Sequence, residues 1–314
     1  MTRVAAIDCG TNTIKLLVAD LFVETGEERE LVREMRMVRL GQDVDRTGVL
    51  ADEALDRAFA ALDEYAAIIA RHDVERLRFC ATSAARDAGN AAVFAAGVES
   101  RLGVVPEVVS GDEEAQLSYD GATRSLVGSD LPAPFLVVDI GGGSTELILG
   151  DPSTRSGTAA GHVRAAQSLD IGSVRMTERH LRSDPPTAAE IAEAAAGIDE
   201  ALDRTVVPVA QARTVVGVAG TITTVTAGVL GLPKYDRAAI DHAVLPVDDV
   251  HATADSLLGM TKAQRTALPY MHPGRADVIG AGALILDRVL RRTTVDSLLV
   301  SEADILDGIA WSVA

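Results

Sequence analysis

The stretch AIDCGTNTIKLLVAD, residues 6–20, constrains the fold more strongly than any other part of the chain. Two apolar runs enclose a small polar cluster at residues 10–13, which is the pattern of two antiparallel strands joined by a tight turn. The glycine permits unusual backbone angles and lets N–H groups approach an anion, while the threonine and asparagine side chains add donors. The stretch therefore predicts a β-hairpin whose turn can hold a phosphate, although a plain hairpin would also fit a single copy.

The same layout returns in the middle of the chain, where residues 137–151 read VVDIGGGSTELILGD. Asp8 aligns with Asp139 and Leu16 with Leu147, so a plain hairpin becomes a poor explanation. A chain of 314 residues also exceeds the size at which single cores stop growing. We expect two similar domains, residues 1–127 and 128–314, that face one cleft, with a final helix able to pack back on the first domain.

A third small-residue turn, VGVAGTITT at residues 216–224, follows an apolar strand expected at 214–218 and opens a helix. Such a turn suits a phosphate or nucleotide contact at a helix N-terminus. A simple strand-to-helix connection is equally compatible with this segment.

Composition favours a folded α/β protein, since 47% of residues are hydrophobic, 24% are charged and only 3% are aromatic. Ala, Val, Leu and Ile must fill the interior, and amphipathic helices are predicted over residues 52–72 and 188–202. No apolar run approaches the ~20 residues of a membrane helix, so we expect a cytoplasmic protein without a membrane partner. Cys9 and Cys80 are too few for a disulfide framework and are expected to be buried.

The charge balance limits the possible partners. Lys and Arg total 29 against 46 acidic residues, which gives a net charge of −17. A nucleic-acid groove would need a basic stripe, so no nucleic-acid partner is expected. A polyanionic substrate would also be repelled by the whole molecule, and its binding must rest on local amides, a few placed cations and metal ions.

Further segments carry a family resemblance: 81–90 (ATSAARDAGN), 107–115 (EVVSGDEEA), 168–175 (SLDIGSVR), 275–279 (RADVI) and 300–304 (VSEAD). They are similar to blocks of the exopolyphosphatase / guanosine pentaphosphate phosphohydrolase family, over essentially the whole chain. The three turns resemble the phosphate-1, phosphate-2 and adenosine motifs of the sugar kinase/Hsp70/actin superfold. The resemblance implies an α/β protein with two actin-like (ribonuclease H-like) domains facing an interdomain cleft. The sequence departs from the family at Leu306-Asp307-Gly308, where Arg-Glu-Gly is common.

The resemblance also implies a catalytic residue. The second Glu of the Ser-Gly-x-Glu-Glu-Ala block activates the attacking water in the family, and it falls on Glu114 here. The alternative is an ordinary acidic helix start, with Ser110 as N-cap and Glu113 completing a capping box.

The resemblance implies a cofactor, Mg²⁺ or Mn²⁺, at Asp139, with Glu146 as a second carboxylate and Asp8 assisting. An exposed strand residue is the alternative for Glu146. The resemblance implies Arg86 as the substrate cation, because the family has an Arg at this motif position that points into the cleft, and a guanidinium fork matches phosphate oxygens. The expected phosphate contacts, besides Arg86, are Thr11, Asn12, Thr13, Thr82, Ser83, Gly142, Gly143, Ser144, Thr145, Gly220 and Thr221.

Lys15, Arg175 and Arg275 are secondary candidates for a substrate cation, and a surface or interdomain ion pair is the favoured interpretation of each. His242, His251 and His272 have neither triad nor zinc-helix spacing, and none is assigned to catalysis.

The sequence therefore predicts an exopolyphosphatase, a metal-dependent hydrolase of the terminal phosphoanhydride of polyphosphate. A guanosine pentaphosphate 5′-phosphohydrolase is the alternative within the same chemistry. An actin/Hsp70-like ATP-dependent kinase or assembly protein is the alternative from another class, but the 107–115 block favours water as the acceptor. The resemblance implies a homodimer. The end at Ala314 and the shortage of basic residues predict a preference for short chains and distributive digestion.

Overall fold

The computed structural model describes residues 1–152 and 161–314. These form two compact units. Unit 1 holds residues 1–128 and 304–314 together with Gly161, and unit 2 holds residues 129–152 and 162–303. The last helix, α13 (Ile305–Trp311), thus belongs to unit 1. Unit 1 is therefore discontinuous in sequence, in contrast to a single division after residue 127.

Unit 1 is built on a five-stranded sheet in the order β3-β2-β1-β4-β5. Its strands are β1 (Thr2–Cys9), β2 (Thr13–Phe22), β3 (Glu27–Met37), β4 (Arg76–Ala81) and β5 (Glu107–Val108). The first three strands are antiparallel, while β4 runs parallel to β1 and β5 runs parallel to β4. The expected first hairpin is β1–β2, and the Gly10 N–H closes its turn by donating to the Thr13 carbonyl at 2.9 Å.

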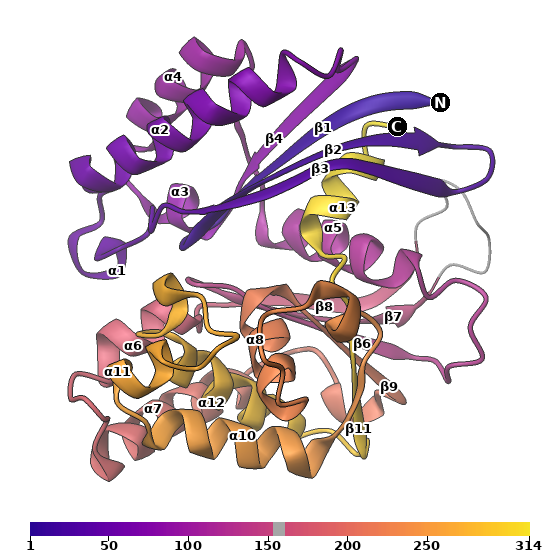
Figure 1. Cartoon of the computed structure of the whole chain (residues 1–314). Helices are drawn as coiled ribbons and strands as arrows, with labels where there is room; N and C mark the ends of the chain where they lie inside the picture. The colour runs from indigo at the N-terminus through magenta and orange to yellow at the C-terminus, as the bar shows by residue number, and fades with distance from the viewer. Residues whose placement is uncertain (153–160) are drawn as a thin grey trace. The chain divides into compact units, whose positions relative to one another are not determined.

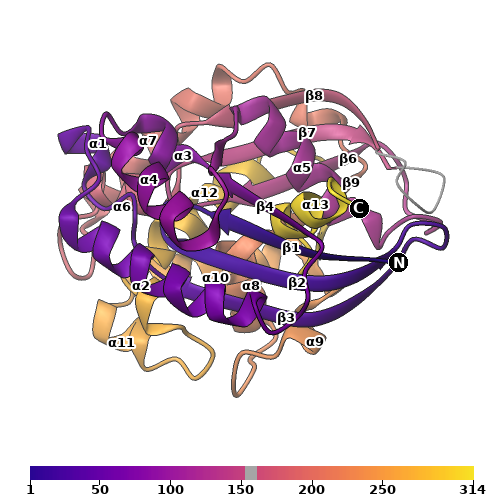
Figure 2. The same ribbon diagram turned by 90° about the horizontal axis from the view of Figure 1, so that it is seen from above.

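Both faces of this sheet are covered, which follows from the alternation of side chains along a strand. Ala5, Ile7 and Cys9 pack with α2 (Asp52–Ile69) and α4 (Ala91–Leu102). Val4 and Ala6 point the other way and pack with α5 (Gly111–Arg124) and α13. Figure 1 shows the two pairs of helices on opposite faces, and Figure 2 shows α13 beside α5. Both faces of β1 are therefore buried.

Unit 2 repeats this topology on a six-stranded sheet in the order β10-β11-β9-β6-β7-β8. Its strands are β6 (Phe135–Ile140), β7 (Thr145–Asp151), β8 (His162–Leu169), β9 (Thr214–Val218), β10 (Val244–Pro246) and β11 (Ser297–Val300). The meander β6-β7-β8 is antiparallel, and β9 and β11 run parallel to β6. Without the short edge strand β10, the order and directions match those of unit 1. The two aligned hairpins therefore lie at the same place in two similar sheets.

The longer helices of unit 2 enclose one apolar core. They are α6 (Ser173–His180), α7 (Ala188–Asp203), α8 (Ala219–Val229), α10 (Val247–Gly259) and α12 (Ile279–Leu290). The short helices of the chain are α1 (Val44–Thr47), α3 (Ser83–Asp87), α9 (Arg237–Ile240) and α11 (Lys262–Thr266). The helices predicted over 52–72 and 188–202 correspond to α2 and α7. No helix among the described residues is long and apolar enough to cross a membrane.

Candidate active site

The first glycine turn of unit 1 is bound to the start of α3. The parallel pairing of β1 and β4 brings the carboxyl ends of both strands to one edge of the sheet. There the Thr82 N–H donates to the Cys9 carbonyl at 3.1 Å, and the hydroxyls of Thr11 and Ser83 are hydrogen-bonded at 2.9 Å. Thr11, Thr82 and Ser83 are all buried. The structure therefore brings together three of the predicted phosphate-binding residues of unit 1.

Glu114 lies in the first turn of α5 and is only 6% exposed. Arg86, which lies in the last turn of α3, donates from Nη1 to Glu114 Oε2 at 2.9 Å and to the Val109 carbonyl at 3.0 Å. An ion pair of this kind fixes the orientation of the carboxylate. The predicted base and the predicted cation are therefore direct neighbours.

The alternative interpretation of residues 110–113, an N-cap at Ser110 completed to a capping box by Glu113, is correct for the N-cap only. Ser110 does cap α5, because its side chain accepts the Glu113 N–H at 3.2 Å. The Glu113 carboxylate, however, pairs with Arg78 at 2.6 Å instead of returning to the N-cap backbone. Glu113 thus contacts the N-cap through its backbone N–H and Arg78 on β4 through its side chain, whereas the Glu114 side chain pairs with Arg86. The first turn of α5 therefore contains both an ordinary helix cap and, at Glu114, a buried carboxylate.

Arg86 also retains donors for a second partner. Its hydrogen bonds within the described residues all leave from Nη1, and its side chain is 28% exposed. The Nε and Nη2 edge of the guanidinium therefore remains able to bind phosphate oxygens. An arginine so placed can hold the base and a substrate oxygen at once.

Lys15 forms ion pairs within unit 1, whereas the sequence favoured a surface or interdomain ion pair. Its side chain is 17% exposed, and Nζ lies 2.6 Å from Asp304 Oδ2 and 3.4 Å from Asp8 Oδ2. All three residues belong to unit 1. Burial raises the pKa of Asp8, and the nearby ammonium opposes that rise. Asp8, the predicted assisting metal ligand, therefore has a lysine as its counter-ion.

The second glycine turn is held by the start of α6. The Gly142 carbonyl accepts the N–H groups of Val174 and Arg175 at 2.9 and 3.1 Å, and Arg175 Nε donates to the Gly143 carbonyl at 2.7 Å. The Thr145 hydroxyl donates to the Ile171 carbonyl at 2.5 Å. The 168–175 block thus supports this turn through the backbone, and Arg175 contributes directly to that support. Because the Thr145 hydroxyl proton is donated to the Ile171 carbonyl, this hydroxyl cannot donate the same proton to a phosphate.

Two carboxylates face each other beside this turn. Asp139 on β6 is paired in register with Glu146 on β7, and the residues are only 7% and 2% exposed. The Ser168 hydroxyl donates to Glu146 Oε1 at 2.7 Å. The alternative of an exposed strand residue at position 146 is therefore wrong. Like charges directly opposite on neighbouring strands are unfavourable unless a cation or proton compensates them.

The carboxylate pair fits a hard divalent ion. Mg²⁺ commonly takes one or two protein carboxylates and completes its shell with water and phosphate oxygens. Within residues 1–152 and 161–314, no group of three or more His, Cys, Asp or Glu residues is arranged to hold a metal. Asp139 and Glu146 can therefore supply only part of such a shell, which suits a substrate that brings its own oxygens.

The third turn carries backbone strain and an arginine. Ala219 has a φ of 65°, a conformation that costs a non-glycine residue of order 1–3 kcal/mol. A side chain at Gly220 would collide with the guanidinium of Arg275. Arg275 Nη1 donates to Thr224 Oγ1 at 3.1 Å, and that hydroxyl donates to the Gly220 carbonyl at 2.6 Å. Arg275 therefore packs on the turn, where a surface or interdomain ion pair had been predicted.

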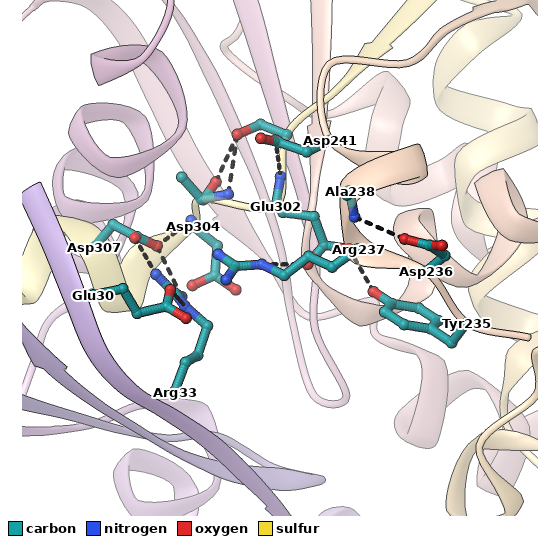
Figure 3. A network of polar contacts seen from close by, with 12 residues as sticks. Glu30, Arg33, Tyr235, Asp236, Arg237, Ala238, Asp241, Glu302, Asp304 and Asp307 are labelled. Atoms are coloured by element: carbon teal, nitrogen blue, oxygen red, sulfur yellow. Dashed lines mark hydrogen bonds and ion pairs between the residues drawn. The ribbon is translucent and has the colours of Figure 1, made fainter.

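The 300–304 block is anchored by polar contacts, which Figure 3 shows. In unit 2, Tyr235 Oη donates to Glu302 Oε1 at 2.6 Å, and the Glu302 N–H donates to Asp241 Oδ1 at 3.0 Å. In unit 1, the Asp304 N–H donates to Asp307 Oδ2 at 2.9 Å. The departure from the family at residues 306–308 therefore still leaves an acid, Asp307, in a structural contact.

The predicted site residues divide between the units. Unit 1 holds Asp8, Thr11, Asn12, Thr13, Thr82, Ser83, Arg86 and Glu114. Unit 2 holds Asp139, Gly142, Gly143, Ser144, Thr145, Glu146, Gly220 and Thr221. Sequence reasoning missed the inward roles of Lys15, Asp304 and Arg275. Asp304 and Arg275 lie in segments that resemble the family, and this resemblance was the one feature of the sequence that could have pointed to them.

Two similar sheets, each with a glycine turn after its first strand, define an actin-like α/β protein. The chain belongs to the Ppx/GppA phosphatase family, which it matches over residues 23–313. It is therefore a phosphatase, and thus a hydrolase.

The chain is also similar to individual proteins of known name or structure. Exopolyphosphatase 2 of Mycobacterium tuberculosis is 48% identical, over 100% of this chain and 99% of its own length. The guanosine-5′-triphosphate,3′-diphosphate pyrophosphatase of Photobacterium profundum is 33% identical over 69% of this chain and 42% of its own length. The solved Ppx/GppA enzyme of Aquifex aeolicus is 30% identical and superposes with a TM-score of 0.80, over 99% of both chains.

Proposed function

We propose that this chain is an exopolyphosphatase that removes the terminal phosphate of inorganic polyphosphate by hydrolysis. The observation that carries the proposal is the buried Glu114 carboxylate held by Arg86 at the start of α5. The full-length similarity to an exopolyphosphatase supports the choice of substrate. The catalytic role of Glu114 is part of the proposal.

Glu114 accepts a proton from a water molecule, whose oxygen then bonds to the terminal phosphorus. The bridging P–O bond breaks, its electron pair stays with the shortened chain, and orthophosphate leaves. The free edge of Arg86 and the N–H groups of the glycine turn of unit 1 bind the phosphoryl oxygens, where negative charge must be neutralised. The hydrogen bond from Arg86 orients the Glu114 carboxylate for this proton transfer.

Asp139 and Glu146 are proposed to hold Mg²⁺ or Mn²⁺. Such an ion supplies positive charge to the phosphoryl and leaving oxygens when it is bound. The support is the register of the two buried carboxylates and the hydrogen bond that orients Glu146 through Ser168.

Guanosine pentaphosphate is the alternative substrate, because it also ends in a phosphoanhydride and a relative is named for that activity. The two substrates are separated by measuring phosphate release from polyphosphate, guanosine pentaphosphate and ATP in parallel. The proposal expects the highest kcat/KM with polyphosphate. A clear preference for guanosine pentaphosphate would select the alternative, and a preference for ATP would favour the kinase or assembly class.

We also propose three further properties. A homodimer is expected from the family resemblance, and a cytoplasmic location is expected from the sequence. A preference for short chains is expected because 46 acidic residues face 29 basic ones, which leaves few cations for an extended polyanion track.

A further inference from the structure

The two duplicated hairpins differ at one register position. In unit 1, Asp8 on β1 is opposite Lys15 on β2. In unit 2, Asp139 on β6 is opposite Glu146 on β7. Because β1–β2 and β6–β7 occupy equivalent places in sheets of the same order, Lys15 stands where unit 2 has its second carboxylate. One hairpin thus contains its own cation and the other contains two acids.

Lys15 bridges two buried carboxylates. Its Nζ atom lies 2.6 Å from Asp304 Oδ2 and 3.4 Å from Asp8 Oδ2, and the acid side chains are only 10% and 7% exposed. Burial acts to raise the pKa of Asp304, yet the Lys15 ammonium and its hydrogen bond hold that pKa below its usual value. Two buried carboxylates around one ammonium form the kind of cluster that is unstable without its cation.

Asp304 is itself held firmly by its surroundings. Its side chain caps α13 by accepting the Leu306 N–H at 3.0 Å, and Asp307, which accepts the Asp304 N–H at 2.9 Å, pairs with Arg33. A side chain at Gly121 on α5 would collide with the Asp304 carbonyl. The ammonium is therefore positioned by the packing of α13 on α5, the helix that also carries Glu114.

We propose that Lys15 is a built-in cation that takes in unit 1 the place a divalent ion takes in unit 2. Asp8 and Asp304 are then counter-ions of Lys15 and not metal ligands, and the chain binds a single divalent ion at Asp139 and Glu146. Asp304 is a positioning residue that acts through Lys15. This inference rests on the metal site of the proposed function, but not on the identity of the substrate.

The test counts bound ions without any substrate. Protein stripped with chelator is titrated with Mn²⁺, and the free ion is measured by electron paramagnetic resonance. The wild type and Asp8→Asn are expected to bind one ion per chain with the same affinity. Glu146→Gln is expected to weaken binding at least about tenfold, because a hard cation loses an anionic oxygen ligand.

Two variants of Lys15 sharpen the test. Lys15→Met leaves Asp8 and Asp304 around a vacant cation position, so a second Mn²⁺ is expected to bind. Lys15→Arg keeps the charge and is the matched control that should still bind one ion. Circular dichroism checks that each variant is folded.

Several results would overturn the inference. They are two ions or none in the wild type, weakened binding in Asp8→Asn, or a folded Lys15→Met variant that binds only one ion. If Lys15→Met does not fold, Asp8→Asn alone still decides the question. A wild type that binds one ion but does not cleave polyphosphate would refute the proposed substrate and leave this inference standing.

Discussion

Replacing Glu114 by glutamine removes the proposed base and leaves the surrounding structure almost unchanged. The amide has nearly the same volume, and its oxygen can still accept the Arg86 Nη1–H that now lies 2.9 Å from Oε2. Arg86 is 28% exposed, so it can also turn toward water. We therefore expect the free energy of unfolding to fall by less than the 3–5 kcal/mol that breaking a fully buried ion pair typically costs.

Turnover should respond far more strongly than stability. An amide cannot take a proton from water, and a positioned general base contributes about 10²–10⁴-fold to a rate. That range corresponds to about 3–5 kcal/mol of transition-state free energy. The expected result is a loss of kcat in this range with a nearly unchanged KM, since Glu114 acts on the water and not on the phosphate chain.

The assay is the initial rate of orthophosphate release at saturating polyphosphate, with thermal unfolding measured on the same preparation. Glu113→Gln is the matched control, because Glu113 is the preceding residue of the same helix but pairs with Arg78. It should retain near wild-type turnover. The reasoning is refuted if Glu114→Gln keeps more than about a tenth of the wild-type kcat, since a general base should contribute at least about 10²-fold.

Three other substitutions and one digestion experiment have defined outcomes. Asp139→Asn should raise the Mg²⁺ concentration needed for half-maximal rate, because a neutral oxygen is a poorer ligand for a hard cation; full activity of the wild type in excess chelator would contradict this. Arg86→Gln should raise KM for polyphosphate at least about tenfold through the loss of a charged phosphate contact, without changing that Mg²⁺ requirement; an unchanged KM would count against the contact. Burial raises the pKa of Glu28 from 4.5 to about 7. The folded state therefore holds this proton more tightly than the unfolded chain does. The free energy of unfolding should fall as the pH rises from the unfolded pKa to the folded one. Glu28→Gln keeps an acceptor for the Trp311 indole N–H, and it should raise Tm relative to wild type at a pH above 7 but not at a pH below the unfolded pKa; equal effects at both would refute the buried acid. Partial digestion of long polyphosphate should shift the whole population downward on a gel, and undiminished long chains beside free phosphate would show processive digestion instead.

The duplicated hairpins could be predicted from sequence because their signals are local. A strand alternates its side chains, a glycine cluster marks the turn, and both features lie within fifteen or so consecutive residues at residues 6–20 and 137–151. The helices α2 and α7 were predicted for the same reason, from the spacing of their apolar residues. Glu114 was found from its block in the family resemblance.

The return of the final helix to the first domain was expected, but the side-chain contacts between distant segments could not be predicted. Lys15 meets Asp304 only because α13 returns to the first sheet, and Arg275 reaches Gly220 only because α8 and the start of α12 share one core. A charged residue looks like a surface residue in sequence until its partner is known. The positive φ of Ala219 could not be predicted either, because an alanine gives no sequence signal for a left-handed backbone conformation.

The most direct test of the proposed reaction uses water enriched in a heavy oxygen isotope. Polyphosphate of defined length is digested in this water, and the products are analysed by mass spectrometry. If a water molecule activated by Glu114 attacks the terminal phosphorus, each released orthophosphate carries a single heavy oxygen and the shortened chain carries none. Label at the new chain end would contradict attack on the terminal phosphorus, and short oligophosphates in place of orthophosphate would contradict the proposed function.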